Sequence, residues 1–419
     1  MNDLDVFAGL LGPEGQALLA ELRDHDPADE LAAATRLRRE HPAELVSAAL
    51  GQARLRQRAV AKFGADAGRM YFTPNGVEQS TRTTVADHRA ARFAALGVRT
   101  LADLCCGIGG DALALARAGI RVLAVDRDPL ACAAARANAE ALGLADLIEV
   151  RCADVTEVDT AGYDAVFVDP ARRSKGRGGR IFDPEAYAPP LSWAVEAARA
   201  APCAALKIAP GVPHEALPAD AETEWISDGG DVKEAVVWFG PAARGSDGPV
   251  RGGRRATLLP AGDSLLGAAR PDPAGDEADR APVGPVGEWL YEPDGAVIRA
   301  HLVADVARQL DGRLIDPTIA YITADRLTAT PYATAYALTD VLPFNVKKLK
   351  ALLRERGVGI AVIKKRGSAV EPEELRKKLK LGDGRKSCTI FLTRVDGAPS
   401  MLLGRPAAEA AGEPVTSGR

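Results

Sequence analysis

The segment Asp103-Leu-Cys-Cys-Gly107-Ile-Gly109-Gly110-Asp111 decides the fold of this 419-residue chain. It joins the strand-like residues 100–104 to a helix-like stretch that begins at Asp111. Glycines in such a turn remove the Cβ atoms that would keep a ligand from the backbone, and the helix N-terminus attracts a negative group. Because many tight turns contain Gly-x-Gly, the segment predicts a cofactor site only if its surroundings agree.

Apolar strands and helical segments alternate around this turn. We predict strands over 100–104, 122–126, 148–154, 163–170 and 203–210, and helices over 111–118, 129–142 and 187–200. Residues 223–227 and 234–239 are expected to close the series as an antiparallel pair. Buried strands separated by helices specify βαβ units. We therefore expect an α/β fold with a Rossmann-like, mostly parallel sheet whose last strand is antiparallel.

An aspartate ends each of the first four predicted strands. Asp126 stands 23 residues after Asp103, close to the roughly 20-residue offset of a carboxylate that binds ribose hydroxyls. Asp154, at the third strand, can accept a hydrogen bond from an adenine amino group, and Asp169 ends the fourth. Open α/β sheets bind ligands at this carboxyl edge. The alternative is that the aspartates only cap the following helices.

Two cofactors are compatible with a glycine turn and Asp126. In a dehydrogenase the turn would bind the pyrophosphate of NAD, whereas in a methyltransferase it would bind the methionine carboxylate while Asp103 holds the ammonium. NAD would leave Asp154 and the Asp169-Pro170 turn without a role, so we favour S-adenosylmethionine. The predicted cofactor-binding residues are Asp103, Cys105, Gly107, Gly109, Gly110, Asp126, Arg127, Asp154 and Val155.

These motifs resemble motifs I to IV of class I methyltransferases that act on nucleic acid. The resemblance rests on Asp-x-x-Cys-Gly-x-Gly from Asp103, Val-Asp-x-Asp-Pro from Val125, Ala-Asp-Val from Ala153 and Val-Asp-Pro-Ala-Arg from Val168. The segment from Phe72-Thr73-Pro74 to His88 is also similar to the cap-trimethylguanosine synthases.

The later part of the chain looks like a bacterial methyltransferase family that joins a class I domain to a ferredoxin-like segment and a THUMP-like C-terminal domain. Residues 290–299, 342–345 and 364–367 carry this resemblance, which covers roughly residues 70–404. It implies RNA as the substrate class, because THUMP modules bind RNA.

Asp169, Pro170 and Arg172 are the predicted catalytic residues. In amino-group base methyltransferases, an Asp/Asn-Pro-Pro-aromatic motif holds the amine and the aromatic ring stacks on the base. Asp169 can still accept from an exocyclic amine, but Arg172 replaces the aromatic residue. An Arg plane can stack on a base or pair with a phosphate, so the methylated atom stays open. A covalent carbon-methylating mechanism would need a nearby cysteine, and Ala171 follows the Asp-Pro pair instead.

Two basic segments predict contact with a polyanion. Residues 172–180 hold five cations and no acid, and residues 347–386 hold 14 Lys/Arg against 5 Asp/Glu. Such runs suit a phosphate backbone, although a solvated surface is the competing interpretation. The predicted substrate-binding residues are Arg173, Lys175, Arg177, Lys364, Lys365 and Arg366.

Composition sets the remaining expectations. The six cysteines form no Cys-x-x-Cys pair, so we predict neither a disulfide framework nor a metal site. The chain has no signal-peptide pattern and no apolar run that could cross a bilayer, which predicts a cytoplasmic protein. The predicted parts are a helical region (1–70), a class I methyltransferase domain (71–265), a linker (266–286), a ferredoxin-like segment (287–329), a THUMP-like basic α+β domain (330–404) and a disordered tail (405–419).

Together these features predict an RNA base methyltransferase that uses S-adenosylmethionine and binds neither membrane nor metal. A small-molecule methyltransferase and a cofactor-binding or RNA-binding protein with a decayed catalytic centre remain alternatives. The sequence leaves the RNA and the oligomeric state open.

Overall fold

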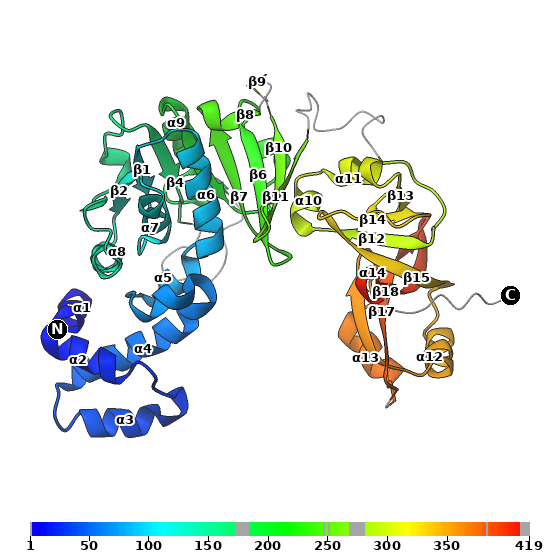
Figure 1. Ribbon diagram of the computed structural model, residues 1–419, viewed down its shortest axis with the longest axis horizontal. Helices are drawn as coiled ribbons and strands as arrows, with labels where there is room; N and C mark the ends of the chain where they lie inside the picture. Colours follow the sequence, from blue (N-terminus) through cyan, green and yellow to red (C-terminus); the bar gives the residue numbers. More distant parts are fainter. Residues whose placement is uncertain are drawn as a thin grey trace. The chain divides into compact units, whose positions relative to one another are not determined.

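The computed structural model describes residues 2–171, 184–245, 248–249, 252–267, 281–382 and 384–410. The chain divides into two compact units, one comprising residues 1–224 and 234–253 and the other residues 225–233 and 254–419. Figure 1 labels the helices and strands of both units.

The N-terminal residues fold into helices, as predicted for residues 1–70. These helices are α1 (Asp3–Leu11), α2 (Pro13–Glu21), α3 (Glu30–Leu37), α4 (Ala43–Phe63), α5 (Pro74–Gln79) and α6 (Thr83–Ala95). Helix α5 lies between the N-terminal helical region and the first strand of the sheet. The Thr73 side chain caps α5 by accepting from the Gly76 N–H at 2.9 Å, and Pro74 at the first helical position has no N–H that needs a partner.

A nine-stranded sheet follows, with strand order β11-β10-β6-β7-β5-β4-β1-β2-β3. Strands β1 to β5 pair in parallel and β7 pairs antiparallel to β5, which confirms the predicted α/β fold. The bounds are β1 (Thr100–Leu104), β2 (Arg121–Asp126), β3 (Ile148–Cys152), β4 (Ala165–Val168), β5 (Ala204–Ile208), β6 (Glu222–Asp228), β7 (Asp231–Phe239), β10 (Arg254–Leu259) and β11 (Asp263–Gly267). The short strands β8 (Arg244–Gly245) and β9 (Gly248–Pro249) form a separate pair.

Strands β3 and β4 are shorter than predicted because the chain turns at their carboxyl ends. Asp154 begins a turn after β3, and Asp169 follows β4 directly. The predicted strands included both aspartates, whereas in the structure β3 ends at Cys152 and β4 ends at Val168.

Helices α7 (Gly110–Arg117), α8 (Pro129–Ala141) and α9 (Leu191–Ala200) connect the parallel strands. Helix α6 lies beside α7 and runs along the front of the sheet in Figure 1. The central strands are buried on both faces; Val166, Phe167 and Leu206 have no exposed surface. Alanines of α8 are buried against the sheet, and their small side chains allow a close approach between helix and strand.

Two buried amides fasten the extended residues Tyr71 and Phe72 between the N-terminal helices and the sheet unit. Asn138 of α8 accepts from the Tyr71 N–H at 2.6 Å and donates to the Tyr71 and Ile108 carbonyls at 3.1 and 2.9 Å. Gln52 of α4 makes a matching pair of bonds with the backbone of Phe72 at 2.8 and 3.0 Å. Because Ile108 belongs to the glycine turn, these amides connect the N-terminal helices to that turn.

The second unit contains a seven-stranded sheet of order β13-β14-β12-β15-β18-β17-β16. Its elements are β12 (Trp289–Pro293), α10 (Gly295–Arg299), α11 (Val303–Gln309), β13 (Arg313–Asp316), β14 (Ile319–Ala324), β15 (Ala333–Pro343), α12 (Val346–Glu355), β16 (Val358–Lys365), α13 (Pro372–Leu379), β17 (Lys386–Val395), β18 (Ala398–Pro406) and α14 (Ala407–Ala410). Helices α10 and α11 are separate because His301, which lies between them, adopts a left-handed conformation with φ 57°.

Two apolar clusters stabilise this sheet. Leu349, Leu353, Leu375 and Leu379 of α12 and α13 pack with strands β16 to β18, whereas Tyr321, Tyr336 and Phe391 belong to a second cluster. Strands from 287–329 and from 330–404 thus share one sheet.

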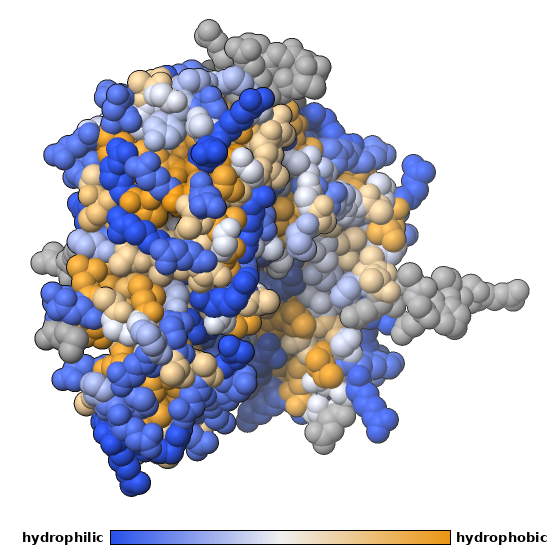
Figure 2. Space-filling view, turned by 60° about the vertical axis from the view of Figure 1, so that its left-hand side comes forward, coloured by the Kyte–Doolittle hydropathy of each residue, from blue (hydrophilic) through white to orange (hydrophobic). Residues whose placement is uncertain are grey.

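The surface mixes polar and apolar side chains. Hydrophilic and hydrophobic side chains are interspersed over the face shown in Figure 2. Exposed apolar residues include Leu31 and Val60 of the N-terminal helices. Of the helices in the described ranges, none combines the length and the hydropathy needed to cross a bilayer.

We expect Asn138→Ala to lower the free energy of unfolding by about 2–4 kcal/mol, because the change leaves several backbone groups buried without partners. Thermal or denaturant unfolding measures the effect. Asn75→Ala, at an exposed position of α5, is the matched control and should change stability by less than about 0.5 kcal/mol. Equal stability of the two variants would contradict the anchoring role of Asn138.

Candidate active site at the carboxyl ends of the strands

The glycine turn between β1 and α7 has the backbone that its composition predicts. Cys105, Gly107 and Gly109 adopt positive φ values of 69°, 57° and 85°, a region that glycine enters at little cost. A Cβ added to Gly107 would meet no atom within 4 Å, whereas one on Gly109 would lie 3.4 Å from Ala135. Gly109 therefore serves close packing, and Gly107 leaves room for a ligand beside the backbone.

Asp126, at the end of β2, holds this turn in place. Its Oδ2 accepts from the Gly107 N–H at 2.9 Å, and its Oδ1 accepts from the Asp128 N–H at 2.9 Å. The carboxylate thereby joins the tip of β2 to the glycine turn. Each oxygen has a further lone pair that can accept from a ligand hydroxyl.

Asp103 on β1 is a fully buried carboxyl group. Within the described residues, neither of its oxygens has a hydrogen-bond partner. Burial and the nearby Asp169 and Asp126 carboxylates raise the pKa of Asp103 to about 7. A buried ionised group without a partner costs free energy, which a ligand cation would offset. This orphaned carboxyl fits the ammonium group of S-adenosylmethionine, and the space beside Gly107 fits its neighbouring carboxylate.

Asp154 occupies the turn after β3 and is exposed. Its Oδ1 accepts from the N–H and the O–H of Thr156 at 2.9 and 2.8 Å, and these bonds lower the pKa of the carboxyl. Asp154 therefore caps the short helical turn that follows β3, as the alternative interpretation of the strand-end aspartates predicts. Val155, in the same turn, has a buried side chain, and the exposed Arg127 acts electrostatically on Asp154.

The structure adds a cation that the sequence analysis missed, Lys207 of β5. Its Nζ donates to Asp169 Oδ2 at 2.7 Å and to Thr81 Oγ1 at 2.9 Å, and it lies 3.8 Å from Glu234 Oε2. The Lys207 side chain is 4% exposed and that of Asp169 is 23% exposed. The signal was present in the sequence, because a lysine stands inside an otherwise apolar strand.

Arg89 of α6 is a second missed residue. Its guanidinium donates to Asp111 and Glu234 and lies 4.3 Å from the centroid of the Phe167 ring. Asp111 also accepts from the Thr81 hydroxyl at 2.7 Å. Side chains from four elements and two loops are thus connected. We call this set the charge cluster: Thr81, Arg89, Asp111, Asp169, Lys207 and Glu234.

Asp103, Asp126 and Asp169 come together as the sequence predicts. Asp103 pairs with Ala124 and Phe167 of the neighbouring strands, and the Asp169 N–H bonds to the Leu104 carbonyl at 3.1 Å. Pro170, next in the chain, is buried. The other predicted residues of this loop lie outside the described residues: Arg172, Arg173, Lys175 and Arg177.

The predicted substrate-binding residues of the second unit have partners within that unit. Lys364 pairs with Glu292; burial opposes its charge, but the bonds to Glu292 and Tyr336 outweigh this and raise its pKa. Lys365 pairs with Glu371 at 2.6 Å. The guanidinium of Arg366 lies 5.3 Å from the Tyr321 ring centroid.

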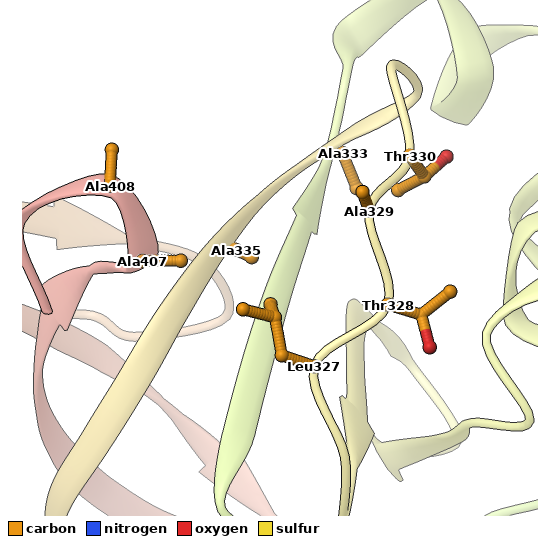
Figure 3. A pocket seen from close by; sticks show the side chains of 8 residues that line it. All are labelled: Leu327, Thr328, Ala329, Thr330, Ala333, Ala335, Ala407 and Ala408. Carbon is orange, nitrogen blue, oxygen red and sulfur yellow. The ribbon is translucent and has the colours of Figure 1, made fainter. Parts of the chain in front are cut away.

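Three other features of the described residues could suggest a site: the cysteines of the glycine turn, a metal cluster and a cavity. Burial and the Asp126 carboxylate raise the pKa of the Cys105 thiol well above its usual value, and burial and Asp103 do so for Cys106, so both thiols stay protonated near neutral pH. The part of the chain that the structure describes holds no cluster of metal-binding side chains. A cavity of about 330 Å³ in the second unit (Figure 3) is lined without charged groups by Leu327, Thr328, Ala329, Thr330, Ala333, Ala335, Ala407 and Ala408.

The strand order, with its antiparallel β7 and the glycine turn after β1, defines the class I methyltransferase fold. A methyltransferase domain model matches residues 101–171, a THUMP domain-like model matches residues 333–406, and a domain of unknown function (DUF8688) matches residues 3–59. A protein of Porphyromonas gingivalis W83, whose crystal structure is described as that of a methyltransferase, shares the fold with a TM-score of 0.72. It is 22% identical in sequence, and the match covers 91% of this chain and 99% of that one.

Uncharacterized S-adenosylmethionine-dependent methyltransferases of Mycobacterium tuberculosis, from strains H37Rv and CDC 1551, are 36% identical over 357 residues, which cover 83% of this chain and 92% of each relative. The chain therefore belongs to the S-adenosylmethionine-dependent methyltransferases and carries a THUMP-like domain, and S-adenosylmethionine is its cofactor.

We expect the affinity for S-adenosylmethionine to fall as the pH drops below about 7, because a protonated Asp103 cannot pair with an ammonium group. Asp103→Asn should bind at least about tenfold more weakly, since a charge-assisted bond is lost. Calorimetric titration between about pH 6 and 8 measures both effects. Asp159→Asn, an exposed aspartate away from the strand tips, is the control. An affinity that does not change with pH would contradict this role.

The same raised pKa predicts how the stability of the ligand-free protein depends on pH. Ionised Asp103 destabilises the fold, so its contribution is most favourable at acidic pH and is lost as the pH rises through about 7. Asp103→Asn should therefore stabilise the ligand-free protein above pH 7 while weakening the binding of the cofactor. Unfolding curves measured without ligand test this sign.

Proposed function

We propose that this protein methylates a base in cytoplasmic RNA, and that Asp169 and Pro170, together with Arg172, form the acceptor side of the site. The observation that carries the proposal is the Asp169 carboxylate, which is partly exposed at the tip of β4 and adjoins the strand that leads into the glycine turn. A carboxylate at this place can accept a hydrogen bond from an exocyclic amine and orient the nitrogen toward a methyl donor.

The cofactor would be held by the groups described above. Asp103 would supply the carboxylate for the ammonium group, and the backbone of the turn at Gly107 and Gly109 would bind the methionine carboxylate. Asp126 would accept from the ribose hydroxyls, and Asp154 with the Val155 backbone would bind the adenine. When bound, S-adenosylmethionine would supply an electrophilic methyl group, and breaking its S–CH3 bond would leave neutral S-adenosylhomocysteine. The acceptor nitrogen would gain that methyl group and lose one proton to solvent.

RNA as the substrate class is supported by the second unit. Helices α12 and α13 bury leucines on one side and expose cations on the other. The exposed cations of these two helices are Lys347, Lys348, Arg354, Arg376, Lys377 and Lys378. Cations that are displayed together on neighbouring helices attract phosphates in any nucleotide sequence. The match to a THUMP domain-like model over the same residues supports RNA rather than a small molecule.

Asp169→Ala should lower methyl transfer by about 100-fold or more, because the acceptor loses the group that orients it. The measurement is incorporation of labelled methyl from S-adenosylmethionine into total RNA from cells that lack the protein, followed by mass spectrometry of the nucleosides. Asp164→Asn, at the amino end of the same strand, is the control and should stay near wild type. Transfer to a metabolite extract but to no RNA would favour a small-molecule methyltransferase, and cofactor binding without transfer would favour a decayed centre.

Replacing Lys347, Lys348 and Arg354 together with Ala should weaken RNA binding and reduce the slope of log K against log salt by about 2, at roughly 0.7 per lost phosphate contact. Titration of labelled RNA at several salt concentrations measures the slope. A matched triple variant at Arg38, Arg39 and Arg121, exposed cations of the other unit, should leave the slope unchanged. Equal loss in both triple variants would contradict a specific role for α12.

A further inference from the structure

The two oxygens of the Asp169 carboxylate are in different environments. Oδ2 accepts from the buried ammonium of Lys207 at 2.7 Å. Among the residues that the structure describes, Lys207 is the hydrogen-bonding partner of this side chain. Lys207 itself is 4% exposed and Asp169 is 23% exposed. Solvent or an acceptor therefore reaches the carboxylate, while the cation remains inside the protein.

We propose that Lys207 is a positioning residue for methyl transfer, which binds Oδ2 of Asp169 and thereby presents Oδ1 to the acceptor. The inference rests on the function proposed above, because it assigns to Asp169 the contact with the acceptor. Lys207 acts through Asp169, since its buried ammonium already has acceptors within the protein.

The surroundings of Lys207 fix the place of its ammonium. Thr81 accepts a bond at 2.9 Å, and Glu234 of β7 lies 3.8 Å away. Thr81 and Glu234 are held in turn, because Thr81 donates to Asp111 and Arg89 donates to both Asp111 and Glu234. A lysine with a flexible stem becomes a rigid support when its neighbours are themselves fixed.

This arrangement also limits the chemistry of the acceptor. With Oδ2 bound to Lys207, Asp169 offers Oδ1 as a hydrogen-bond acceptor. A nucleophile that carries a hydrogen, such as an exocyclic amine, can bind there. A ring nitrogen or a carbonyl oxygen without a hydrogen would instead meet a repulsive lone pair. The charge cluster thus favours an acceptor that carries a hydrogen, such as an amino group, over one that does not.

The test compares Lys207→Met, Lys207→Arg, Asp169→Ala and the double variant Lys207→Met/Asp169→Ala in the full chain. The substrate is total RNA from cells that lack the protein, with labelled S-adenosylmethionine. Lys207→Met should lower kcat at least about tenfold at saturating S-adenosylmethionine, because the lost interaction orients the acceptor. Since Lys207 also lowers the pKa of Asp103, the KM for S-adenosylmethionine is compared well above pH 7, where Asp103 is ionised in both proteins, and should there stay within about twofold. Lys207→Arg should recover part of the loss. Lys233→Met removes a lysine paired with Asp231 on the neighbouring strand β7 and should leave kcat unchanged.

The double variant separates positioning from a structural role. If Lys207 acts through Asp169, the double variant is no slower than Asp169→Ala alone, since residues that act as a unit are not additive. A double variant that is clearly slower would overturn the inference. So would a Lys207→Met enzyme with wild-type kcat beside an inactive Asp169→Ala enzyme, and the proposed function would then still stand.

Two further measurements cover the remaining outcomes. If Lys207→Met does not fold, Lys207→Gln, whose amide still donates, replaces it and should retain more activity than Asp169→Ala. If no RNA accepts methyl, the proposed function fails, and crystal structures of the wild-type and Lys207→Met proteins decide about Lys207. We expect the Asp169 carboxylate to rotate in the variant, and an unchanged orientation would overturn its positioning role.

Discussion

Mutual repulsion between carboxylates at neighbouring strand tips is the constraint on which this site depends. Asp103, Asp126 and Asp169 end or nearly end three adjacent parallel strands, and burial together with the other two charges raises the pKa of Asp103 to about 7. Such a cluster would destabilise the fold unless cations offset it. Lys207 and Arg89 supply that offset from within the protein. In the proposed binding mode, the cofactor ammonium would add a further positive charge next to Asp103.

The two compensating cations come from different parts of the fold. Lys207 belongs to the parallel strand β5, whereas Arg89 comes from helix α6, which precedes the sheet. Glu234 of the antiparallel strand β7 is the acidic partner of Arg89 and lies near Lys207. The N-terminal helices contribute in another way. Gln52 and Asn138 fasten the Tyr71–Phe72 segment, and Phe63 approaches the position where a Cβ of Gly110 would lie, at 3.7 Å. Gln52 lies in the region 3–59 that matches a domain of unknown function, so this region is linked to the glycine turn through the Tyr71–Phe72 segment and Asn138.

In the second unit, apolar packing stabilises the sheet and the cations lie on the outer side of its helices. One seven-stranded sheet carries an apolar cluster with the leucines of α12 and α13 and another with three aromatic residues. Because the inner leucines hold the two helices to the sheet, their outer cations need no partner within the fold. Burial of the leucines and exposure of the cations thus explain how this segment folds with excess positive charge. Between Lys347 and Lys386 the surplus is nine cations, 14 minus 5. The lysines at the end of β16 differ, since Glu292 and Glu371 pair with them.

The sequence by itself determined the sheet type, the glycine turn and the aspartates at the strand tips. These features follow from local patterns, because strand periodicity, glycine at positive φ and the spacing from Asp103 to Asp126 are all read within about 30 residues of chain. Only the tertiary structure decided the partners of those aspartates. Lys207 lies 38 residues from Asp169, and Arg89 lies 145 residues from Glu234. A single charged residue inside an apolar strand or helix gives no sequence signal for the residue it will contact. The members of the charge cluster are therefore brought together only by tertiary packing.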